Sequence, residues 1–515
     1  MKPFFPFASR RELRKIMALV LAVVMVLGVA TAFASGATYT ITMNTTSEHT
    51  YAAYQVFSGD LDGSTLSNID WGEGVNGTSL LEALKADGTY GTAFANCTTA
   101  ADVAKVMANY TSNGNEIAAL ADIIGANTAT AAGSGTTSIA GLEAGYYLIV
   151  DTTAQDSMPE GNTYSDFMLE VVKDVNVNAK DTTTTSDKKV KDINDSTAAP
   201  ESGDNYTDWQ DSADYDVNDV VPFKLTGTVA SDYAKYETYY FAFHDEESAG
   251  LTFNANSVHV YLGATGTTEI SSDYYTLKTS DFEDDCTFEI VFTDLKQVSG
   301  VTAGSVIRVE YTSTVNENAV MGSAGNPNTS YIEFSNNPNG NQHGRTPDDT
   351  VIVFTYKVVV NKIDNAGNPL EGAGFTLYKK NDAGEYVAVG TELKGDTMTT
   401  FTWNRLDDGD YKLVETTTPS GKNTIDDILF TITAEHEIHS DSPALTNLSG
   451  NVISGEATFT SSTNEGSLST NVVNESGAVL PSTGGIGTTM FYVGGGLLAL
   501  IAVVLLVTKR RMSAE

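Results

Sequence analysis

Three polar residues in the C-terminal half of the chain stand where apolar stripes end, and together they could form a covalent bond. Lys362 and Asn474 each follow a run in which apolar residues alternate, and Glu415 follows Tyr411 and Leu413 at the same spacing. Because alternate residues of a β-strand share a face, each polar side chain is expected on the face turned to the core. An unpaired charge there is very costly, so this pattern requires a chemical explanation.

Burial of a lysine and a glutamate disfavours the charged form of both, which leaves a neutral amine beside a neutral acid. The amine is then a nucleophile. The protonated carboxyl of Glu415 can polarise the amide carbonyl of Asn474 and carry protons while ammonia leaves. The sequence therefore predicts an amide bond between Lys362 and Asn474, formed once per molecule with no cofactor and no metal. This single event is autocatalytic, so we do not expect an enzyme.

Both ends of the sequence indicate export. Basic residues precede an apolar run and a small-residue exit, which predicts a secretory signal peptide over residues 1–34. At the other end, the apolar residues 490–507 are long enough to span a bilayer, and the basic residues of the tail 508–515 should stay cytoplasmic.

A five-residue motif, LPSTG, stands just before this apolar segment. Motif, apolar span and basic tail in this order resemble the sorting signal of Gram-positive cell wall proteins. The resemblance implies that a sortase cleaves between the last two residues of the motif through a thioacyl intermediate. The residues of the motif are Leu480, Pro481, Ser482, Thr483 and Gly484.

Residues 411–421, which carry the pattern YxLxETxxPxG, resemble the E-box of sortase-assembled pilins. Asn474 lies six residues before Leu480, as in the closing strand of the last domain of those proteins. Over nearly its whole length, the chain resembles the major (backbone) pilins of Gram-positive bacteria. This resemblance implies a fimbrial shaft subunit on the cell wall, built from collagen-adhesin-like domains that crosslink themselves.

The resemblance also implies a second crosslink in the middle of the chain. Asp245 shares a strand face with two phenylalanines and would be its acid, and Lys188 precedes Val190 on one face as the reactive lysine does. The segment TSTVNENAV resembles the one that holds the bonded amide, which suggests Asn316, although strict alternation would then require a bulge. The alternatives that stay open are Lys189 for the lysine and Asn318 or Asn336 for the amide.

The segment VNVNAKD, which ends the first domain, resembles the pilin motif V-x-V-x-P-K, with Ala179 where proline is usual. The resemblance implies that Lys180 attacks the sortase-bound Thr483 of another subunit, and this makes a head-to-tail fibre of identical subunits. Further partners would be a pilus-class sortase, peptidoglycan, minor pilins and a host-surface ligand.

The elements that must hold these residues are mostly strands. The chain is rich in Val, Tyr, Phe and Thr with Gly/Asn turns, and helical spacing occurs only early, at residues 79–86, 100–110 and 115–125. We therefore expect a mainly β protein with tandem immunoglobulin-like β-sandwich domains, the first with added helices. The expected domains are an N-terminal pilin domain (35–180), a middle isopeptide-forming β-sandwich (187–349) and a C-terminal collagen-adhesin B-type isopeptide domain (351–476).

Composition restricts the alternatives. A formal net charge of −37 disfavours nucleic acid as a partner. The two cysteines, Cys97 and Cys286, are far apart and form no disulfide framework. The six histidines show no recognisable catalytic or metal spacing, which disfavours an exported hydrolase. The remaining alternative is an LPXTG-anchored adhesin, or a tip or basal pilin, that is not polymerised.

Overall fold

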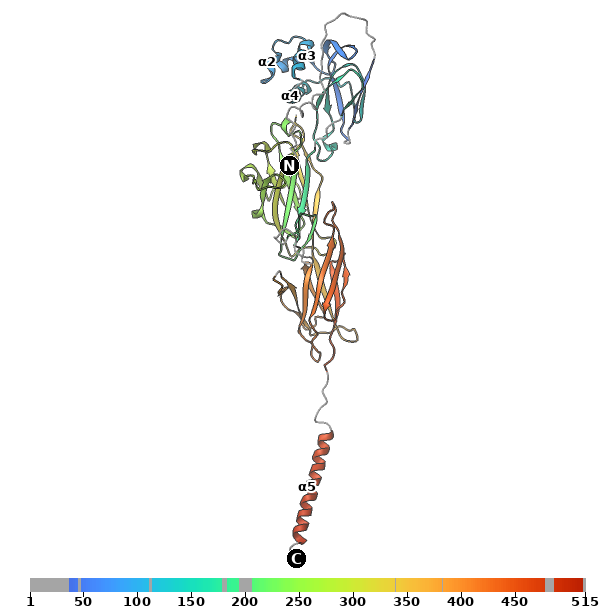
Figure 1. The fold of residues 1–515 in the computed structure, drawn as a ribbon, viewed down its shortest axis with the longest axis vertical. Coiled ribbons are helices and arrows are strands. Elements are labelled where there is room, and N and C mark those ends of the chain that lie inside the picture. Colours follow the sequence, from blue (N-terminus) through green and yellow to red (C-terminus); the bar gives the residue numbers. More distant parts are fainter. Residues whose placement is uncertain are drawn as a thin grey trace, which may run out of the picture.

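The computed structural model describes residues 37–44, 48–110, 114–177, 183–193, 206–338, 340–381, 383–477 and 486–512. Three β-rich domains follow one another along the long axis of the molecule, and a single helix lies beyond the third (Figure 1). The prediction of a mainly β fold with tandem sandwich domains is confirmed, and so is the prediction of added helices in the first domain.

The described residues of the N-terminal domain form two sheets and four α-helices. Figure 1 shows α2, α3 and α4 beside the strands. Its sheets have the strand orders β5-β1-β8 and β3-β2-β6-β7, with β4 paired to β2. A capping box formed by Thr99 and Asp102 begins α3, in agreement with the helix start predicted at residue 100. The elements are β1 (Tyr39–Met43), β2 (Tyr51–Asp62), β3 (Thr65–Trp71), α1 (Gly77–Ala86), α2 (Gly91–Phe94), α3 (Ala100–Met107), α4 (Gly114–Gly125), β4 (Gly133–Gly135), β5 (Ser138–Leu142), β6 (Gly145–Asp151), β7 (Phe167–Val171) and β8 (Val175–Val177).

The middle domain packs two sheets around one aromatic-rich core. One sheet has the order β13-β17-β11-β9, with β14 on β17, and the other has the order β10-β20-β18-β12-β16-β15, with β19 on β18. Its strands are β9 (Thr185–Val190), β10 (Ser212–Asp214), β11 (Val220–Thr228), β12 (Phe241–Glu247), β13 (Leu251–Phe253), β14 (His259–Leu262), β15 (Thr276–Lys278), β16 (Phe288–Phe292), β17 (Val306–Val315), β18 (Asn326–Ser335), β19 (His343–Arg345) and β20 (Asp349–Phe354).

The boundary between the middle and C-terminal domains differs from the expected one. The run that begins at residue 351 was expected to open the third domain, yet β20 pairs with β18 and β10 of the middle domain. Only after Thr355 does β21 join the next sheet. The apolar run contains no turn residues at this point, because one strand leads almost directly into the other.

The C-terminal domain is a second two-sheet sandwich. Its sheets have the orders β25-β21-β30-β29 and β23-β22-β26-β27-β28, with β24 on β22. The first and last long strands, β21 and β30, are parallel neighbours in one sheet. The strands are β21 (Tyr356–Ile363), β22 (Gly374–Lys380), β23 (Tyr386–Ala388), β24 (Leu393–Lys394), β25 (Thr400–Leu406), β26 (Gly409–Thr417), β27 (Ile428–His436), β28 (Leu445–Ser454), β29 (Thr460–Ser462) and β30 (Ser467–Val473).

Direct hydrogen bonds join the three domains. Between the first two domains, the Tyr164 backbone N–H donates to the Asn336 carbonyl at 2.8 Å. Between the last two, the Asp407 backbone N–H donates to the Asp216 carboxylate at 2.8 Å, and the Lys379 ammonium donates to the same carboxylate at 2.8 Å. The chain is thus a row of modules with polar, specific contacts at each junction.

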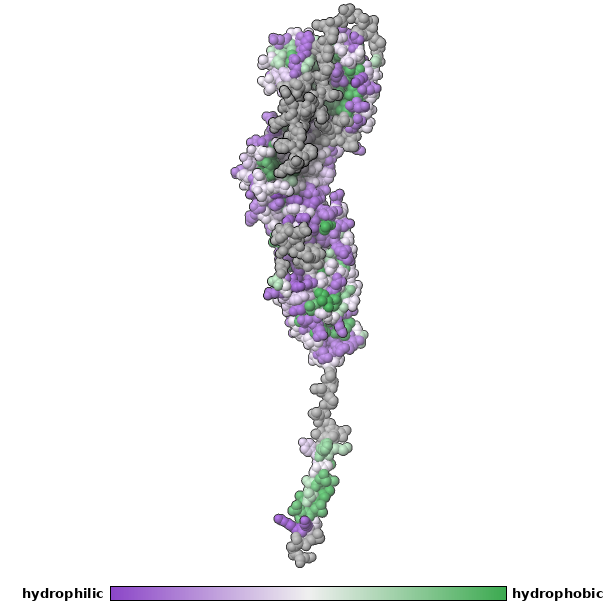
Figure 2. Space-filling model, in the orientation of Figure 1, coloured by the Kyte–Doolittle hydropathy of each residue, from purple (hydrophilic) through white to green (hydrophobic). Residues whose placement is uncertain are grey.

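The last helix is α5 (Ile486–Met512), and its residues 490–510 are exposed and mostly apolar. Residues 490–510 have a mean hydropathy of 2.6. By length and composition, this segment is long and apolar enough to cross a membrane. Figure 2 shows this helix as an apolar segment well separated from the largely polar surface of the domains. The predicted span at residues 490–507 lies within it.

Candidate functional site: two buried lysine–acid–amide groups

Lys362 lies in the interior of the C-terminal domain. It stands near the end of β21, directly across from Val472 on the parallel strand β30, and its side chain is fully buried. Its ammonium nitrogen Nζ donates to the Val472 carbonyl at 2.8 Å. Burial lowers the pKa of Lys362 to about 8, although the nearby Glu415 carboxylate opposes part of this change. The lysine therefore gives up its proton far more readily than an exposed lysine.

Glu415 and Asn474 meet beside it. Glu415 comes from β26 in the opposite sheet and is only 5% exposed, while Asn474 follows β30 and is fully buried. The Asn474 side-chain nitrogen Nδ2 donates to Glu415 Oε2 at 2.9 Å and to the Asn423 carbonyl at 2.5 Å. The other oxygen of each side chain, Glu415 Oε1 and Asn474 Oδ1, is buried without a hydrogen-bond partner. Buried acceptors without a donor are costly, so this arrangement requires an explanation beyond packing.

The middle domain contains a comparable group built across its two sheets. Lys188 on β9 is fully buried, and its Nζ donates to Asp245 Oδ2 on β12 at 2.5 Å and to the Tyr311 hydroxyl at 2.9 Å. The Tyr311 hydroxyl donates to the same carboxylate oxygen at 2.8 Å. Desolvation lowers the pKa of Lys188 and raises that of Asp245, so burial favours a neutral amine and a neutral acid here too.

The amide that is hydrogen-bonded to this group belongs to Asn328 on β18, which is not among the residues predicted from the sequence. Asn328 is fully buried, and its Nδ2 donates to the Tyr311 hydroxyl at 2.9 Å, while its Oδ1 has no partner. A signal was present in the sequence, because strict alternation along NPNTSYIEFS sets Asn326, Asn328 and Ser330 on the face of Ile332. Polar residues on an inward face are the same signal that identified Glu415.

The amides proposed from the sequence lie elsewhere. Asn316 follows β17, and its Nδ2 donates to the carbonyls of Ala249 and Leu251, each at 3.0 Å, at the end where β13 pairs with β17. The structure therefore does not bring Asn316 to Lys188. Asn318 is exposed, and Asn336 is buried beyond the far end of β18, where its carbonyl contacts the N-terminal domain. None of these three lies within the hydrogen-bonded group around Lys188.

Lys189, the alternative lysine, points to the outer side of β9. Its ammonium pairs with Asp187 at 2.6 Å and with Asp211 at 2.7 Å, and its side chain is 24% exposed. These two carboxylates raise its pKa and hold it charged. A lysine held as a cation is a poor nucleophile, so this environment favours Lys188.

The residues assigned to the sortase reaction lie outside the described residues. These are Lys180, which follows β8 by three positions, and the motif residues Leu480, Pro481, Ser482, Thr483 and Gly484. On β6 of the N-terminal domain, Tyr146, Leu148 and Val150 repeat the spacing of Tyr411, Leu413 and Glu415, with valine in place of the acid. No lysine–acid–amide group of this kind occurs among the described residues of that domain.

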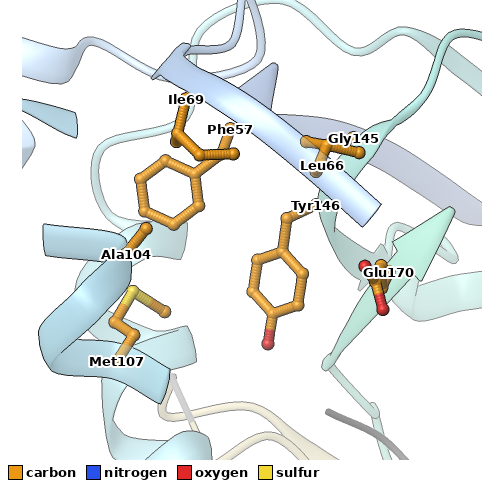
Figure 3. A pocket seen from close by; sticks show the side chains of 8 residues that line it. All are labelled: Phe57, Leu66, Ile69, Ala104, Met107, Gly145, Tyr146 and Glu170. Atoms are coloured by element: carbon orange, nitrogen blue, oxygen red, sulfur yellow. The ribbon is translucent and has the colours of Figure 1, made fainter. Parts of the chain in front are cut away.

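The N-terminal domain contains a small pocket between β-strands and α3 (Figure 3). Figure 3 shows the Tyr146 ring in it, between Met107 and Glu170, with Phe57 and Ala104 nearby. The pocket is apolar apart from the Tyr146 hydroxyl and the Glu170 carboxylate. All its lining residues belong to the N-terminal domain, so it is separate from the two lysine–acid–amide groups.

Comparison with known proteins agrees with this architecture. The family model of the SpaA prealbumin-like fold domain matches residues 356–442, and the model of the LPXTG cell wall anchor motif matches residues 472–513. The trypsin-resistant surface T6 protein of Streptococcus pyogenes is 26% identical over 333 residues, which are 52% of this chain and 60% of that protein. The chain thus matches less than two thirds of this relative's length.

The fold is shared with one solved structure, and a second one is more distantly similar. The T6 backbone pilin of serotype M6 Streptococcus pyogenes aligns with a TM-score of 0.52 and 18% identity over 87% of this chain and all of that one. The full-length major pilin SpaD of Corynebacterium diphtheriae aligns with a TM-score of 0.45 and 17% identity over 87% of this chain and 99% of that one. The chain therefore contains a SpaA-type prealbumin-like domain and a cell wall anchor motif, which places it at the cell wall, and it is similar to the T6 protein and to Gram-positive backbone pilins.

Proposed function

We propose that this chain is the shaft subunit of a covalent surface fibre. A pilus-class sortase joins Thr483 of one subunit to Lys180 of the next, and the finished fibre is attached to peptidoglycan, where it supports adhesion. The middle and C-terminal domains each carry an intramolecular Lys–Asn amide bond. The observation that carries this proposal is the joint burial of Lys362, Glu415 and Asn474, with Lys362 hydrogen-bonded to Val472 two residues before Asn474 and Asn474 hydrogen-bonded to Glu415.

In the C-terminal domain, the neutral Lys362 amine attacks the side-chain carbonyl carbon of Asn474. The new C–N bond forms, the bond from that carbon to Nδ2 breaks, and the nitrogen leaves as ammonia. The Glu415 carboxyl supplies the proton that Nδ2 needs and receives the one that the amine loses. Its position 2.9 Å from Nδ2 supports this role, because the acid contacts the leaving atom.

In the middle domain, we assign the crosslink to Lys188 and Asn328, promoted by Asp245. The Tyr311 hydroxyl contacts all three side chains and would hold them together. Because β9 and β18 belong to opposite sheets, this bond would fasten the two layers of the sandwich to each other.

This assignment predicts the effect of two asparagine substitutions. Asn328→Ala should prevent the loss of one ammonia from the mature protein, about 17 Da, whereas Asn316→Ala should leave that loss unchanged. Intact-mass measurement of both variants, followed by peptide mapping, decides between the two residues. Retained ammonia in the Asn316 variant alone would reverse the assignment.

The pH dependence of the C-terminal crosslink follows from the proton that Lys362 and Glu415 share. The reactive pair needs one proton, on the carboxyl, while the amine is neutral. Above the Lys362 pKa of about 8, that proton is lost to solvent and the carboxylate has none to give. For chain refolded from inclusion bodies, the rate of ammonia loss should therefore fall above about pH 8. A rate that keeps rising above this pH would show that Glu415 donates no proton.

The two proposed bonds lie in the part of the chain that would carry tension. In a fibre joined from Thr483 to Lys180, force passes through residues 180–483 and bypasses the domain upstream of Lys180. That upstream domain has Val150 where Glu415 stands in the last domain. The acid that promotes crosslinking is thus missing from the domain that bears no load.

Peptide mapping of fibres tests this function. Fibres from cells that express the pilus-class sortase should yield a branched peptide in which the Thr483 carbonyl is bonded to the Lys180 amine. Recovery of Thr483 bonded only to peptidoglycan would instead indicate a monomeric wall-anchored adhesin.

A further inference from the structure

A mixed cluster of metal-ligand side chains lies on the outer face of the middle domain, away from Lys188. His244 alternates with Asp245 along β12, so its imidazole points out of the core. Its ring nitrogen Nδ1 lies 3.0 Å from Asp284 Oδ2 and 3.6 Å from the Cys286 sulfur Sγ. The fourth group is Glu289, the direct neighbour of His244 on β16, whose Oε1 lies 3.9 Å from the same nitrogen.

We propose that His244, Asp284 and Cys286 form a Zn²⁺ site, with Glu289 beside it on the neighbouring strand. Nitrogen, thiolate and carboxylate ligands are the set that Zn²⁺ takes in a tetrahedron, at about 2.0–2.3 Å from each atom. Ligand atoms at those bond lengths lie about 3.3–3.7 Å apart. The ligand atoms of His244, Asp284 and Cys286 all lie within 4.8 Å of one another, and His244 Nδ1 is 3.0 Å from Asp284 and 3.6 Å from Cys286, so small side-chain shifts bring the three to these separations.

The surroundings of the cluster match those of a metal centre. His244 Nε2 lies 3.5 Å from Glu333 Oε2, and a carboxylate at this nitrogen turns Nδ1 toward a metal. The Tyr331 ring stacks on the imidazole with centroids 4.5 Å apart, and its hydroxyl donates to Asp284. Lys278 donates to Glu289 Oε2, which leaves Oε1 for the ion. These contacts fix the orientation of the His244 and Glu289 side chains.

A metal ion can reach the cluster from solvent, and its binding releases one proton. The Asp284 side chain is 32% exposed, so an ion can reach the site from solvent, while the Cys286, His244 and Glu289 side chains are largely buried. On binding, the S–H bond of Cys286 breaks, a sulfur–zinc bond forms, and the proton leaves to solvent. The site could not be predicted from the sequence spacing of its ligands, because only the sheet and the loop before β16 bring His244 and Cys286 together.

Cobalt substitution tests the site on the full chain in reducing, chelator-treated buffer. One equivalent of Co²⁺ should give a thiolate-to-cobalt charge-transfer absorption and the visible bands of a tetrahedral ion, and Zn²⁺ should abolish both. The Cys286→Ser variant should lose the charge-transfer band. The matched control is Cys97→Ser, since the other free, buried cysteine should leave the spectrum unchanged.

A second substitution, on an exposed loop, tests the site without disturbing the buried core. Asp284→Asn, on an exposed loop, should weaken Zn²⁺ binding at least about tenfold as measured by competition with a chromophoric chelator. Absence of any cobalt band, or a band that survives in Cys286→Ser, would overturn the proposal. Unchanged Zn²⁺ affinity in Asp284→Asn would also overturn it.

Discussion

The mature Glu415→Gln variant should retain about 17 Da of ammonia that the wild-type protein loses, because its C-terminal domain cannot crosslink. Glutamine preserves the shape of the side chain, and Lys362 and Asn474 remain in place. It has no ionisable proton to give to Asn474 Nδ2, which lies 2.9 Å from the carboxylate. Intact-mass measurement detects the difference directly, and the wild-type protein should be lighter than its sequence by two ammonia molecules.

The same variant should unfold more easily. Lys362 and Asn474 enclose more than one hundred residues, and closing a loop of that size stabilises a domain by about 4–5 kcal/mol on the chain-entropy model. For a domain of this size, such a loss lowers the unfolding midpoint by about 15 °C or more. Calorimetry should resolve this shift, and pulling experiments should show the domain extending where the wild-type domain does not.

Glu392→Gln is the matched control. Glu392 also lies beside β26, but it is exposed and accepts hydrogen bonds from Thr416 and Thr417 on the outside of the sheet. Its substitution should leave both the ammonia loss and the unfolding midpoint unchanged. If Glu415→Gln lost both ammonia molecules, the carboxyl would have no role in the bond.

The C-terminal group could be predicted from the sequence because each of its members ends a clear alternating stripe. Alternation fixes which face a residue occupies, and burial then follows for Lys362, Glu415 and Asn474 alike. The pairing of β21 with β30 is long-range, yet only a parallel alignment of these strands sets Lys362 beside Val472 and thus near Asn474. Local pattern and tertiary contact therefore agree in this domain.

The middle domain shows where local pattern is insufficient. Lys188 and Asp245 could be predicted from the alternating apolar residues of their strands. The identity of the amide residue depends on which strand of the opposite sheet faces β9. β18 occupies that position and carries Asn328, whereas Asn316 follows β17 in the same sheet as β9. Which strands face one another across a sandwich is decided by the packing of whole sheets, and no single segment records it. The domain boundary at Thr355 was missed for a different reason, because the apolar run has no turn residues where β20 leads into β21.

Lys180→Arg should reduce the polymer to monomer. Arginine keeps the positive charge but its guanidinium stays protonated, so it cannot attack the thioacyl carbonyl that the sortase holds. Cells that express the pilus-class sortase should show a ladder of high-mass species on denaturing gels for the wild-type chain. The variant should show only wall-anchored monomer, because attachment through Thr483 does not need Lys180.

Lys173→Arg is the control for this experiment. Lys173 is exposed and lies in the same stretch, between β7 and β8, so its loss tests whether any accessible lysine suffices. A ladder that persists in Lys180→Arg and disappears in Lys173→Arg would assign the junction to Lys173.

The two kinds of reactive lysine have opposite requirements. Lys362 must be buried to become a nucleophile within its own domain, whereas the junction lysine must reach an enzyme and a second subunit. An amine-reactive probe should therefore label the junction lysine in monomers and leave Lys362 unmodified.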